Sequence, residues 1–243
     1  MKLRGKTAVI TGGGSGIGAA IAQAFAGEGC RVIIAGRQVE KLNEVAKKIS
    51  GEPKIEVHEA DVGNRESVNT LFKWVAKEVG PVHILVNAAG INIKTRMMAD
   101  MQPEQWDQVM SVNATGVYNC VNCVLPQMRE RRDGLIINIS STSGKRAGKL
   151  GGVAYSASKF AVSAFSTAVA GEVAQEGVRV TSICPGEVDT PILANRPVAV
   201  TPEHRARMLQ PEDVAAAALM VALLPPRANV FEMIIKPTTQ EFV

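Results

Sequence analysis

The sequence predicts a single α/β domain of the doubly wound class, in which about seven parallel strands form a sheet with helices on both faces. Two observations lead to this prediction. Short runs rich in Val and Ile alternate along the whole chain with longer segments whose apolar residues have helical spacing, as in successive β-α-β units. The 243 residues are 46% hydrophobic and include no repeat, linker or low-complexity tract, which suits one domain, residues 1–243, with a full core.

The predicted strands are short and rich in β-branched residues. They span Thr7–Thr11, Arg31–Ala35, Ile55–Glu59, Ile84–Asn87, Leu135–Ile139, Val178–Ile183 and Val230–Ile235. The helices predicted between them span Ile17–Gly27, Val39–Ser50, Arg65–Val79, Pro103–Arg131, Val153–Gln175 and Pro211–Leu224. Strands that alternate with helices in this way predict a parallel sheet whose two faces are both covered.

Two further segments, Asn92–Gln102 and Glu187–Leu209, carry Pro, Met and charged residues without a strong period. In a doubly wound fold, ligands bind beyond the carboxyl ends of the strands, and loops at that end tend to be functional. The alternative for both segments is a surface loop with no role. Because of its length, we expect Glu187–Leu209 to form a lid over the substrate.

The composition argues against two classes of partner. The formal net charge is +4, but the Lys and Arg residues are scattered and form no basic helix, unlike those of a nucleic-acid-binding protein. No apolar run approaches the ~20 residues that a membrane span needs, and Met1–Arg4 leads into the first strand without the apolar region of a secretory signal. We therefore expect a cytoplasmic protein that binds neither nucleic acid nor a membrane.

The cysteines and histidines show no metal-binding pattern. Cys120 and Cys123 have CxxC spacing, but they lie inside a helical apolar pattern, and no second pair of cysteines or histidines accompanies them. The other two cysteines and the three histidines are isolated. We predict no metal site and four reduced thiols, Cys30, Cys120, Cys123 and Cys184, that act as small core residues.

A glycine-rich turn follows the first predicted strand directly. Thr11–Gly18 reads Thr-Gly-Gly-Gly-Ser-Gly-Ile-Gly, and Gly14–Ala19 fits the pattern G-x-G-x-x-A. Glycines let the backbone approach a pyrophosphate, which the N–H groups and the positive end of the following helix attract. A simple flexible turn is the alternative, but the place between strand and helix favours a Rossmann-type dinucleotide site. Its expected residues are Gly12, Gly14, Ser15, Gly16, Ile17 and Gly18.

The end of the second strand indicates which dinucleotide is bound. A carboxylate about 20 residues after the turn would bind the ribose 2′-hydroxyl of NAD. Here the strand ends in Gly36 and Arg37, and a guanidinium has the shape and charge to bind a phosphate. This favours NADP(H) over NAD(H), although Arg37 could instead be solvated or stack on adenine.

Tyr155 and Lys159 are four residues apart in a predicted helix, so they share one face. A free phenol has a pKa near 10, which is too high for efficient proton transfer at neutral pH. A neighbouring ammonium favours the phenolate and lowers that pKa. A Tyr packed on a Lys stem is the alternative for this pair alone, but next to a dinucleotide site the pair predicts acid–base chemistry during hydride transfer.

Together and in this order, these motifs resemble the short-chain dehydrogenase/reductase family over essentially the whole chain. The matching segments are Thr11-Gly12-x-x-x-Gly16-Ile17-Gly18, Asp61-Val62, Asn87-Ala88-Ala89-Gly90, Val112-Asn113, Ile139-Ser140-Ser141, Tyr155-x-x-x-Lys159 and Pro185-Gly186-x-Val188-x-Thr190. The catalytic residues that the resemblance implies are Asn113, Ser141, Tyr155 and Lys159. The cofactor residues that it implies are Asp61 and Val62 at adenine, Asn87 and Gly90 at the adenosine ribose, Tyr155 and Lys159 at the nicotinamide ribose, and Pro185, Gly186, Val188 and Thr190 at the nicotinamide.

In the mechanism that this resemblance implies, Ser141 orients the substrate oxygen and Tyr155 transfers the proton. Lys159 lowers the pKa of the phenol, and Asn113 holds a water that connects Lys159 to solvent. Ser141 lies 14 residues before Tyr155, where 13 is common in the family, so Ser140 and Ser143 are alternative candidates. Asn113 could instead satisfy local backbone groups, as buried asparagines usually do.

The resemblance implies an NADP(H)-dependent dehydrogenase or reductase that acts on a secondary alcohol or ketone. The segment Asn229–Thr238 lacks the glycine-rich ending of many acyl-carrier-protein reductases. It is more similar to NADP-dependent 3-hydroxy acid dehydrogenases and some carbonyl reductases. Two alternatives stay open, a 3-oxoacyl thioester reductase and a non-catalytic dinucleotide-binding regulator.

We also expect a homodimer or homotetramer. The helices Pro103–Arg131 and Val153–Gln175 carry more apolar surface than one face of a sheet covers, and twofold association is the commonest way to bury such surface. The residues on or near these apolar stripes are Val117, Cys120, Val124, Phe165 and Val169.

Overall fold

The computed structural model describes residues 1–241, which form one seven-stranded sheet in the order β3-β2-β1-β4-β5-β6-β7. Every neighbouring pair of strands is parallel. The strands are β1 (Thr7–Thr11), β2 (Arg31–Gly36), β3 (Glu56–Glu59), β4 (Ile84–Asn87), β5 (Gly134–Ile139), β6 (Val178–Pro185) and β7 (Glu232–Ile235). The predicted fold class is therefore confirmed.

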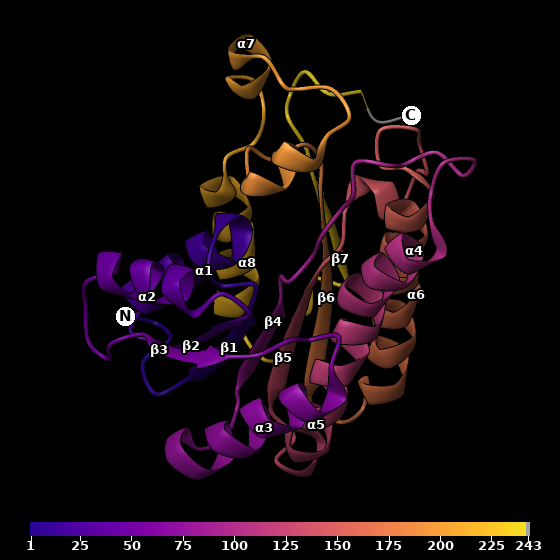
Figure 1. The fold of residues 1–243 in the computed structure, drawn as a ribbon. Helices are drawn as coiled ribbons and strands as arrows, with labels where there is room; N and C mark the ends of the chain where they lie inside the picture. Colours follow the sequence, from indigo (N-terminus) through magenta and orange to yellow (C-terminus); the bar gives the residue numbers. More distant parts are fainter. Residues whose placement is uncertain (242–243) are drawn as a thin grey trace.

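Helices cover both faces of the sheet (Figure 1). One layer is made by α1 (Gly16–Gly27), α2 (Val39–Lys48) and α8 (Pro211–Leu223), and the other by α3 (Arg65–Trp74), α5 (Gly116–Glu130) and α6 (Val153–Val173). Two shorter helices, α4 (Pro103–Met110) and α7 (Pro202–Arg205), complete the set in the described residues.

Two hydrophobic clusters hold these layers together, one on each side of the sheet. Successive side chains of a strand point to opposite faces. Ile10 and Ile34 accordingly belong to the cluster under α1 and α8, whereas Val9 and Ile33 belong to the cluster under α5 and α6. Because both faces are buried, the central strands are mostly hydrophobic on both sides, which explains why their existence could be predicted from short apolar runs.

The predicted helix Pro103–Arg131 is not one α-helix. The structure breaks it into α4 and α5, which are joined by a widened turn of π type over Ser111–Thr115. Asn113 lies within this turn, where its side chain bonds to the backbone of Ile91. At the start of α5, a Cβ on Gly116 would stand 2.7 Å from a side-chain carbon of Val62, so glycine allows this close approach. The apolar period continues through the turn and does not reveal it.

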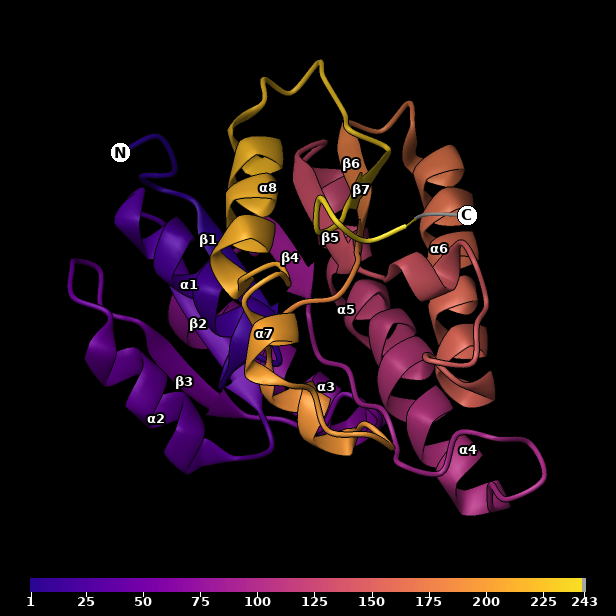
Figure 2. The same ribbon diagram turned by 90° about the horizontal axis from the view of Figure 1, so that it is seen from above.

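A second π-type turn, Val75–Val79, ends the predicted helix Arg65–Val79, of which only Arg65–Trp74 is α-helical. The segment Glu187–Leu209 has more structure than its sequence suggests. It contains a 3-10 helix over Pro191–Asn195 and the short helix α7. A bridge between Val188 and Leu209 closes its base. Seen from above, α7 lies between the two helix layers (Figure 2).

The apolar residues expected at a subunit interface lie inside the chain instead. Val117, Cys120, Val124 and Val169 are buried in the core, and Phe165 is only partly exposed. Their stripes pack on the sheet and on neighbouring helices, so they provide no surplus apolar surface. On these helices the exposed large apolar side chains are Tyr118, Val153 and Phe160.

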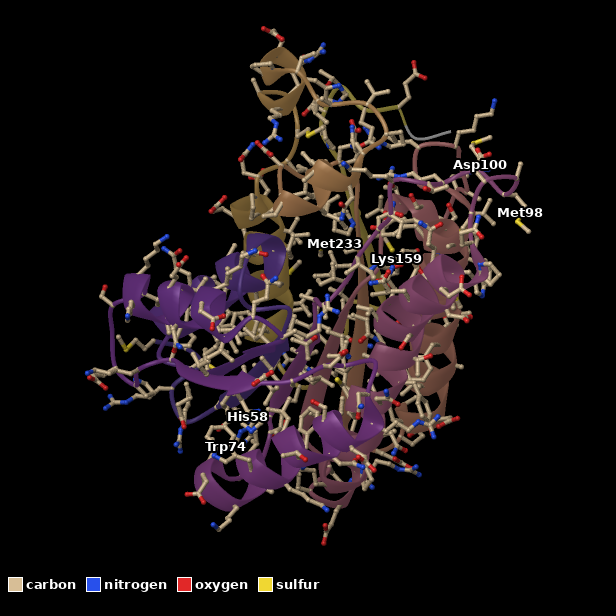
Figure 3. All side chains as sticks on the ribbon, in the orientation of Figure 1. His58, Trp74, Met98, Asp100, Lys159 and Met233 are labelled. Carbon is tan, nitrogen blue, oxygen red and sulfur yellow. The ribbon has the colours of Figure 1, made fainter. Side chains whose placement is uncertain are left out.

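Within residues 1–241, no helix is long and apolar enough to cross a membrane, and no cluster of three metal-ligating side chains is found. All four cysteines are free thiols. His58 packs on Trp74 with ring centroids 5.0 Å apart, and Figure 3 shows this pair far from Lys159.

Candidate active site

A cleft of about 680 Å³ lies at the carboxyl ends of the strands. β1 is the point where the strand order reverses, because the chain proceeds outward from it to β2 on one side and returns to β4 on the other. Ligands of doubly wound folds bind at such a point. The predicted site residues that line the cleft are Gly12, Gly14, Ser15, Gly16, Ile17, Gly18, Arg37, Asp61, Val62, Gly90, Ser141, Tyr155, Pro185, Gly186, Val188 and Thr190.

The glycine-rich turn brings the N-terminus of α1 to this cleft. Gly12 has φ +69°, and a Cβ there would stand 2.7 Å from the backbone nitrogen of Ala89, so only glycine fits between β1 and the loop after β4. Ser15 precedes α1 without a capping bond from its side chain. The first N–H groups of α1 therefore have no side-chain cap and are available to an anion.

Positive side chains mark one end of the cleft. Arg37 and Lys41 both line it just beyond β2. Both side chains are exposed, so they can adjust to a ligand. Asp61 stands nearby, with its carboxylate accepting the N–H of Gly63 at 2.9 Å. Lys41 is a site residue that the sequence did not single out, since a lysine on the polar face of a helix carries no distinctive signal.

At the other end of the cleft, Tyr155 and Ser141 face each other. A hydrogen bond from Ser141 and the charge of Arg96 lower the pKa of Tyr155, but burial outweighs them and raises that pKa above its usual value. The sequence predicted a lowered pKa for Tyr155, whereas burial in the folded chain shifts that pKa upward. The hydroxyl of Ser140 is 3.0 Å from the carbonyl of Lys159 and 2.9 Å from Ser163 Oγ, so it bonds to α6 rather than to Tyr155.

Lys159 is buried behind Tyr155, on the side of α6 that faces the sheet (Figure 3). Its Nζ is 5.7 Å from the centroid of the Tyr155 ring and donates to the carbonyl of Ile139 at 2.8 Å. Burial lowers the pKa of Lys159 to about 8. Gly90 lies next to the ammonium, and a Cβ there would be in ordinary van der Waals contact with Nζ at 3.5 Å.

With this geometry established, comparison with known proteins decides the family. The family model for short chain dehydrogenases matches residues 6–199. The chain belongs to the short-chain dehydrogenase family. An uncharacterized oxidoreductase of Staphylococcus aureus is 40% identical over 235 residues, which cover 97% of this chain and 98% of the relative.

Two solved structures of short-chain dehydrogenase fold extend the comparison. An alcohol dehydrogenase from the archaeon Thermococcus sibiricus, complexed with 5-hydroxy-NADP, has a TM-score of 0.87 and 28% identity, with 97% of this chain and 98% of that chain covered. A 3-ketoacyl-(acyl-carrier-protein) reductase from Brucella melitensis, complexed with NADH, has a TM-score of 0.87 and 29% identity, with coverage of 97% and 98%. This chain is therefore an oxidoreductase of the family, with a site for a nicotinamide dinucleotide.

Three predicted site residues do not line the cleft of this short-chain dehydrogenase, although all are near it. Lys159 lies behind Gly90. Asn113 accepts the N–H of Ile91 at 2.8 Å and donates to the carbonyl of Ile91 and to Ser158 Oγ, both at 3.0 Å. Asn87 is buried in the sheet and donates to Asn138 Oδ1 at 2.8 Å. The water-holding role of Asn113 and the ribose contact of Asn87 stay predictions.

Several lining residues were missed by reasoning from the sequence. They come from three segments that meet only in the folded chain, namely the loop after β4, the segment Glu187–Leu209 and the C-terminal segment. The missed residues of most interest are Asn92, Arg96, Asn195, Arg196 and Gln240. The irregular segments Asn92–Gln102 and Glu187–Leu209 were recognised as loops at the ligand end, but nothing in either pattern pointed to a particular side chain.

Proposed function

We propose that this short-chain dehydrogenase transfers a hydride between NADP(H) and a secondary alcohol or the corresponding ketone. The observation that carries the proposal is the placement of Ser141 and Tyr155 on the wall of one cleft, with Lys159 Nζ 5.7 Å from the centroid of the Tyr155 ring. A non-catalytic dinucleotide sensor has no use for a proton donor held in this way. The family shown above supports the class of reaction.

In the proposed reaction, Ser141 donates a hydrogen bond to the substrate oxygen and fixes its position. Tyr155 takes the hydroxyl proton during alcohol oxidation and returns it during ketone reduction. A bound nicotinamide supplies the hydride acceptor or donor. Lys159 stabilises negative charge on the phenol in proportion to its own protonation, and the lowered pKa of Lys159 makes that contribution depend on pH.

The residues of the cleft also fit a dinucleotide. The uncapped start of α1 offers N–H groups to a pyrophosphate, and Gly12 and Gly16, with positive φ, keep side chains away from its path. Arg37 and Lys41 supply two positive charges where a ribose 2′-phosphate would lie, and no carboxylate stands at the end of β2 to repel it. These charges support NADP(H) as the preferred cofactor.

The finer expectations form part of the proposal. The lid, residues 187–209, covers the substrate, and the protein works in the cytoplasm as a dimer or tetramer. The exposed aromatic rings of Tyr118 and Phe160 are the candidates for contacts between subunits, in place of the buried residues named from the sequence.

A substrate screen that follows NADPH absorbance tests this function. It should include neutral ketones, oxo acids and a 3-oxoacyl thioester, because the thioester reaction is the second candidate and one structural neighbour is a 3-ketoacyl-(acyl-carrier-protein) reductase. Tyr155→Phe keeps the ring and removes the proton donor, so its turnover should fall by roughly 10²–10⁴-fold while NADPH binding is retained. Turnover of Tyr155→Phe at a near-normal rate would refute the catalytic assignment.

A further inference from the structure

Arg96 is the most buried guanidinium on the cleft, with only 7% of its surface exposed. It binds three different parts of the chain. Nε donates to the carbonyl of Ile93 at 2.9 Å, one terminal nitrogen donates to the carbonyl of Leu150, and the other donates to the carbonyl of Asn195 at 2.8 Å. These acceptors belong to the loop after β4, the loop before α6 and the 3-10 helix of the lid.

The bond to Asn195 is the one that spans the cleft. We use "catalytic wall" for residues 139–160, which carry Ser141 and Tyr155. Among the hydrogen bonds of residues 1–241, the lid bonds within itself and to Gln240, and only Arg96 links it to the catalytic wall or to the loop after β4. This single side chain therefore connects the lid to the catalytic wall, through the carbonyls of Asn195 and Leu150.

The backbone of Arg96 is fixed at the catalytic wall as well. Its carbonyl accepts the N–H of Val153, the first residue of α6, at 3.3 Å. Gly152, with φ +81°, lies against it so closely that a Cβ would stand 2.6 Å from the Cβ of Arg96. Asn92 donates to the carbonyl of Gly151 at 3.0 Å and fastens the same loop a second time. Arg96 is thus held at the N-terminal turn of the helix that carries Tyr155.

The charge of Arg96 is not neutralised by a carboxylate. No residue in 1–241 forms an ion pair with it, whereas the nearby Arg196 is paired with Glu187 at 2.5 Å. The charge of Arg96 acts on the phenol of Tyr155, and Lys159 Nζ lies 5.7 Å from the centroid of the same ring. Arg196 lies near Arg96, but its charge is paired with Glu187, and the thiol of Cys184 is the titratable group beside Lys159. Among the ion pairs of residues 1–241, neither Arg96 nor Lys159 has a carboxylate partner.

We propose that Arg96 is a positioning residue, which ties the lid to the catalytic wall through Asn195 and holds an unpaired positive charge beside Tyr155. The proposal rests on the function proposed above. The tie to the lid needs the planar guanidinium of arginine, because its nitrogens donate to three carbonyls at fixed angles. A lysine at this position would supply only the positive charge. The two tasks can therefore be separated by substitution.

The test compares Arg96→Met, which removes both the guanidinium hydrogen bonds and the positive charge, with Arg96→Lys, which keeps the charge. Arg227→Met, at an exposed position away from the cleft, is the matched control. Two quantities are measured: hydrogen exchange of residues 187–209 in the protein with NADP(H), and the pH profile of kcat for alcohol oxidation. Thermal unfolding of each variant is recorded first, and Arg96→Lys carries the test if Arg96→Met does not fold.

Both Arg96 variants should exchange faster over 187–209 than the wild type, because both lose the bond to Asn195. Their kcat/KM should fall roughly 10- to 100-fold through misplacement of the pocket walls. Only Arg96→Met should move the rise of kcat to higher pH, because oxidation needs the deprotonated phenol, which the cation favours. Arg227→Met should match the wild type in both measurements.

A structural role alone would lower stability and rate while leaving the pH profile of Arg96→Met in place, and that result would overturn the charge assignment. Unchanged exchange over 187–209 in both variants would overturn the tie to the lid. If no substrate is turned over even by the wild type, the proposed function fails, but the exchange measurement still decides whether Arg96 holds the lid.

Discussion

Lys159 donates its ammonium hydrogen bond to the carbonyl of Ile139, the last residue of β5, across 2.8 Å. The bond holds the ammonium between α6 and the end of β5. It also keeps a cationic group in a place where only 5% of the residue is exposed, and that burial explains the lowered pKa. The arrangement has a cost in stability that can be measured.

Lys159→Met should be more stable than the wild type at pH 7. The unfolded chain binds the lysine proton up to pH 10.5, whereas the folded chain releases it near pH 8, so folding is penalised below pH 8. The penalty is at most about 3 kcal/mol, reduced by the Ile139 carbonyl that the variant leaves unpaired. As the pH rises from about 8 to 10.5, the wild type should approach the variant. Denaturant unfolding at a series of pH values measures this, and a difference that does not change with pH would contradict it.

The two neighbouring serines should respond differently to removal of the hydroxyl. Ser141→Ala should lower kcat/KM roughly 10²- to 10³-fold, as loss of a donor to a reacting oxygen does elsewhere, and the loss of the bond from the N–H of Ser143 should also cost about 1 kcal/mol of unfolding free energy. Ser140→Ala removes the bonds to α6 instead and should cost about 1 kcal/mol of unfolding free energy. Steady-state kinetics and thermal unfolding of both variants provide the comparison. Greater loss of turnover in Ser140→Ala would reverse the assignment.

Cofactor preference should depend on the two cations beyond β2. Arg37→Ala should raise the KM for NADPH roughly 10- to 100-fold and leave that for NADH nearly unchanged, because the lost bond is a charge-assisted one to phosphate. Lys41→Ala should act in the same direction with a smaller effect, since an ammonium contributes a point charge without a fork. Equal use of NADH and NADPH by the wild type would remove the basis of this prediction.

The lid should become more protected when ligands bind. Pro191 and Pro197 restrict its backbone, and Leu193 lies buried on its inner side. Lids of this kind exclude water and often limit turnover. Hydrogen exchange over residues 190–206 should therefore slow when NADP(H) and substrate are both present. Protection confined to Gly12–Gly18 would show that the segment does not close over the substrate.

A pH effect should also be visible within the lid. Burial by itself raises the pKa of Glu187, but hydrogen bonds from His204 and Arg196, together with their charges, hold it below its usual value. The Glu187 carboxylate stabilises the fold fully above the pKa that it has in the unfolded chain. This stabilisation is lost as the pH falls through the lower pKa of Glu187 in the folded chain. Exchange of the lid should rise as the pH falls below about 4.5, and Glu187→Gln should exchange faster at neutral pH with less dependence on acid.

The sequence was sufficient to predict the strands, because the central strands of a sheet buried on both faces are short runs of mostly apolar residues. It was equally sufficient for the glycine-rich turn and for Tyr155 with Lys159, whose spacing places them on one helical face. The predicted helix boundaries ran through the widened turn at Ser111–Thr115, since an inserted residue leaves the apolar period almost intact, although a kink was expected around Asn113. The sign of the Tyr155 pKa shift was missed because burial is a property of the whole fold.

Arg96 illustrates a further limit of reasoning from sequence. Its three partners are backbone carbonyls, which every residue possesses, so no pattern of side chains marks them. Val117 and its neighbours illustrate the opposite case, in which an apolar stripe was visible but the surface that covers it was not. The stripe packs on the chain's own sheet, and only the three-dimensional arrangement distinguishes that from a subunit contact.

Tyr155 and Lys159 share α6, whose inner face is packed on the sheet along most of its length. The groups proposed to transfer the proton are thus built into the part of the molecule that tolerates the least change. The segments opposite them are surface loops, where insertions and substitutions disturb little else. Substitutions in the loops opposite Tyr155 and Lys159 should therefore change which substrate fits the cleft, while these two residues on α6 stay in place.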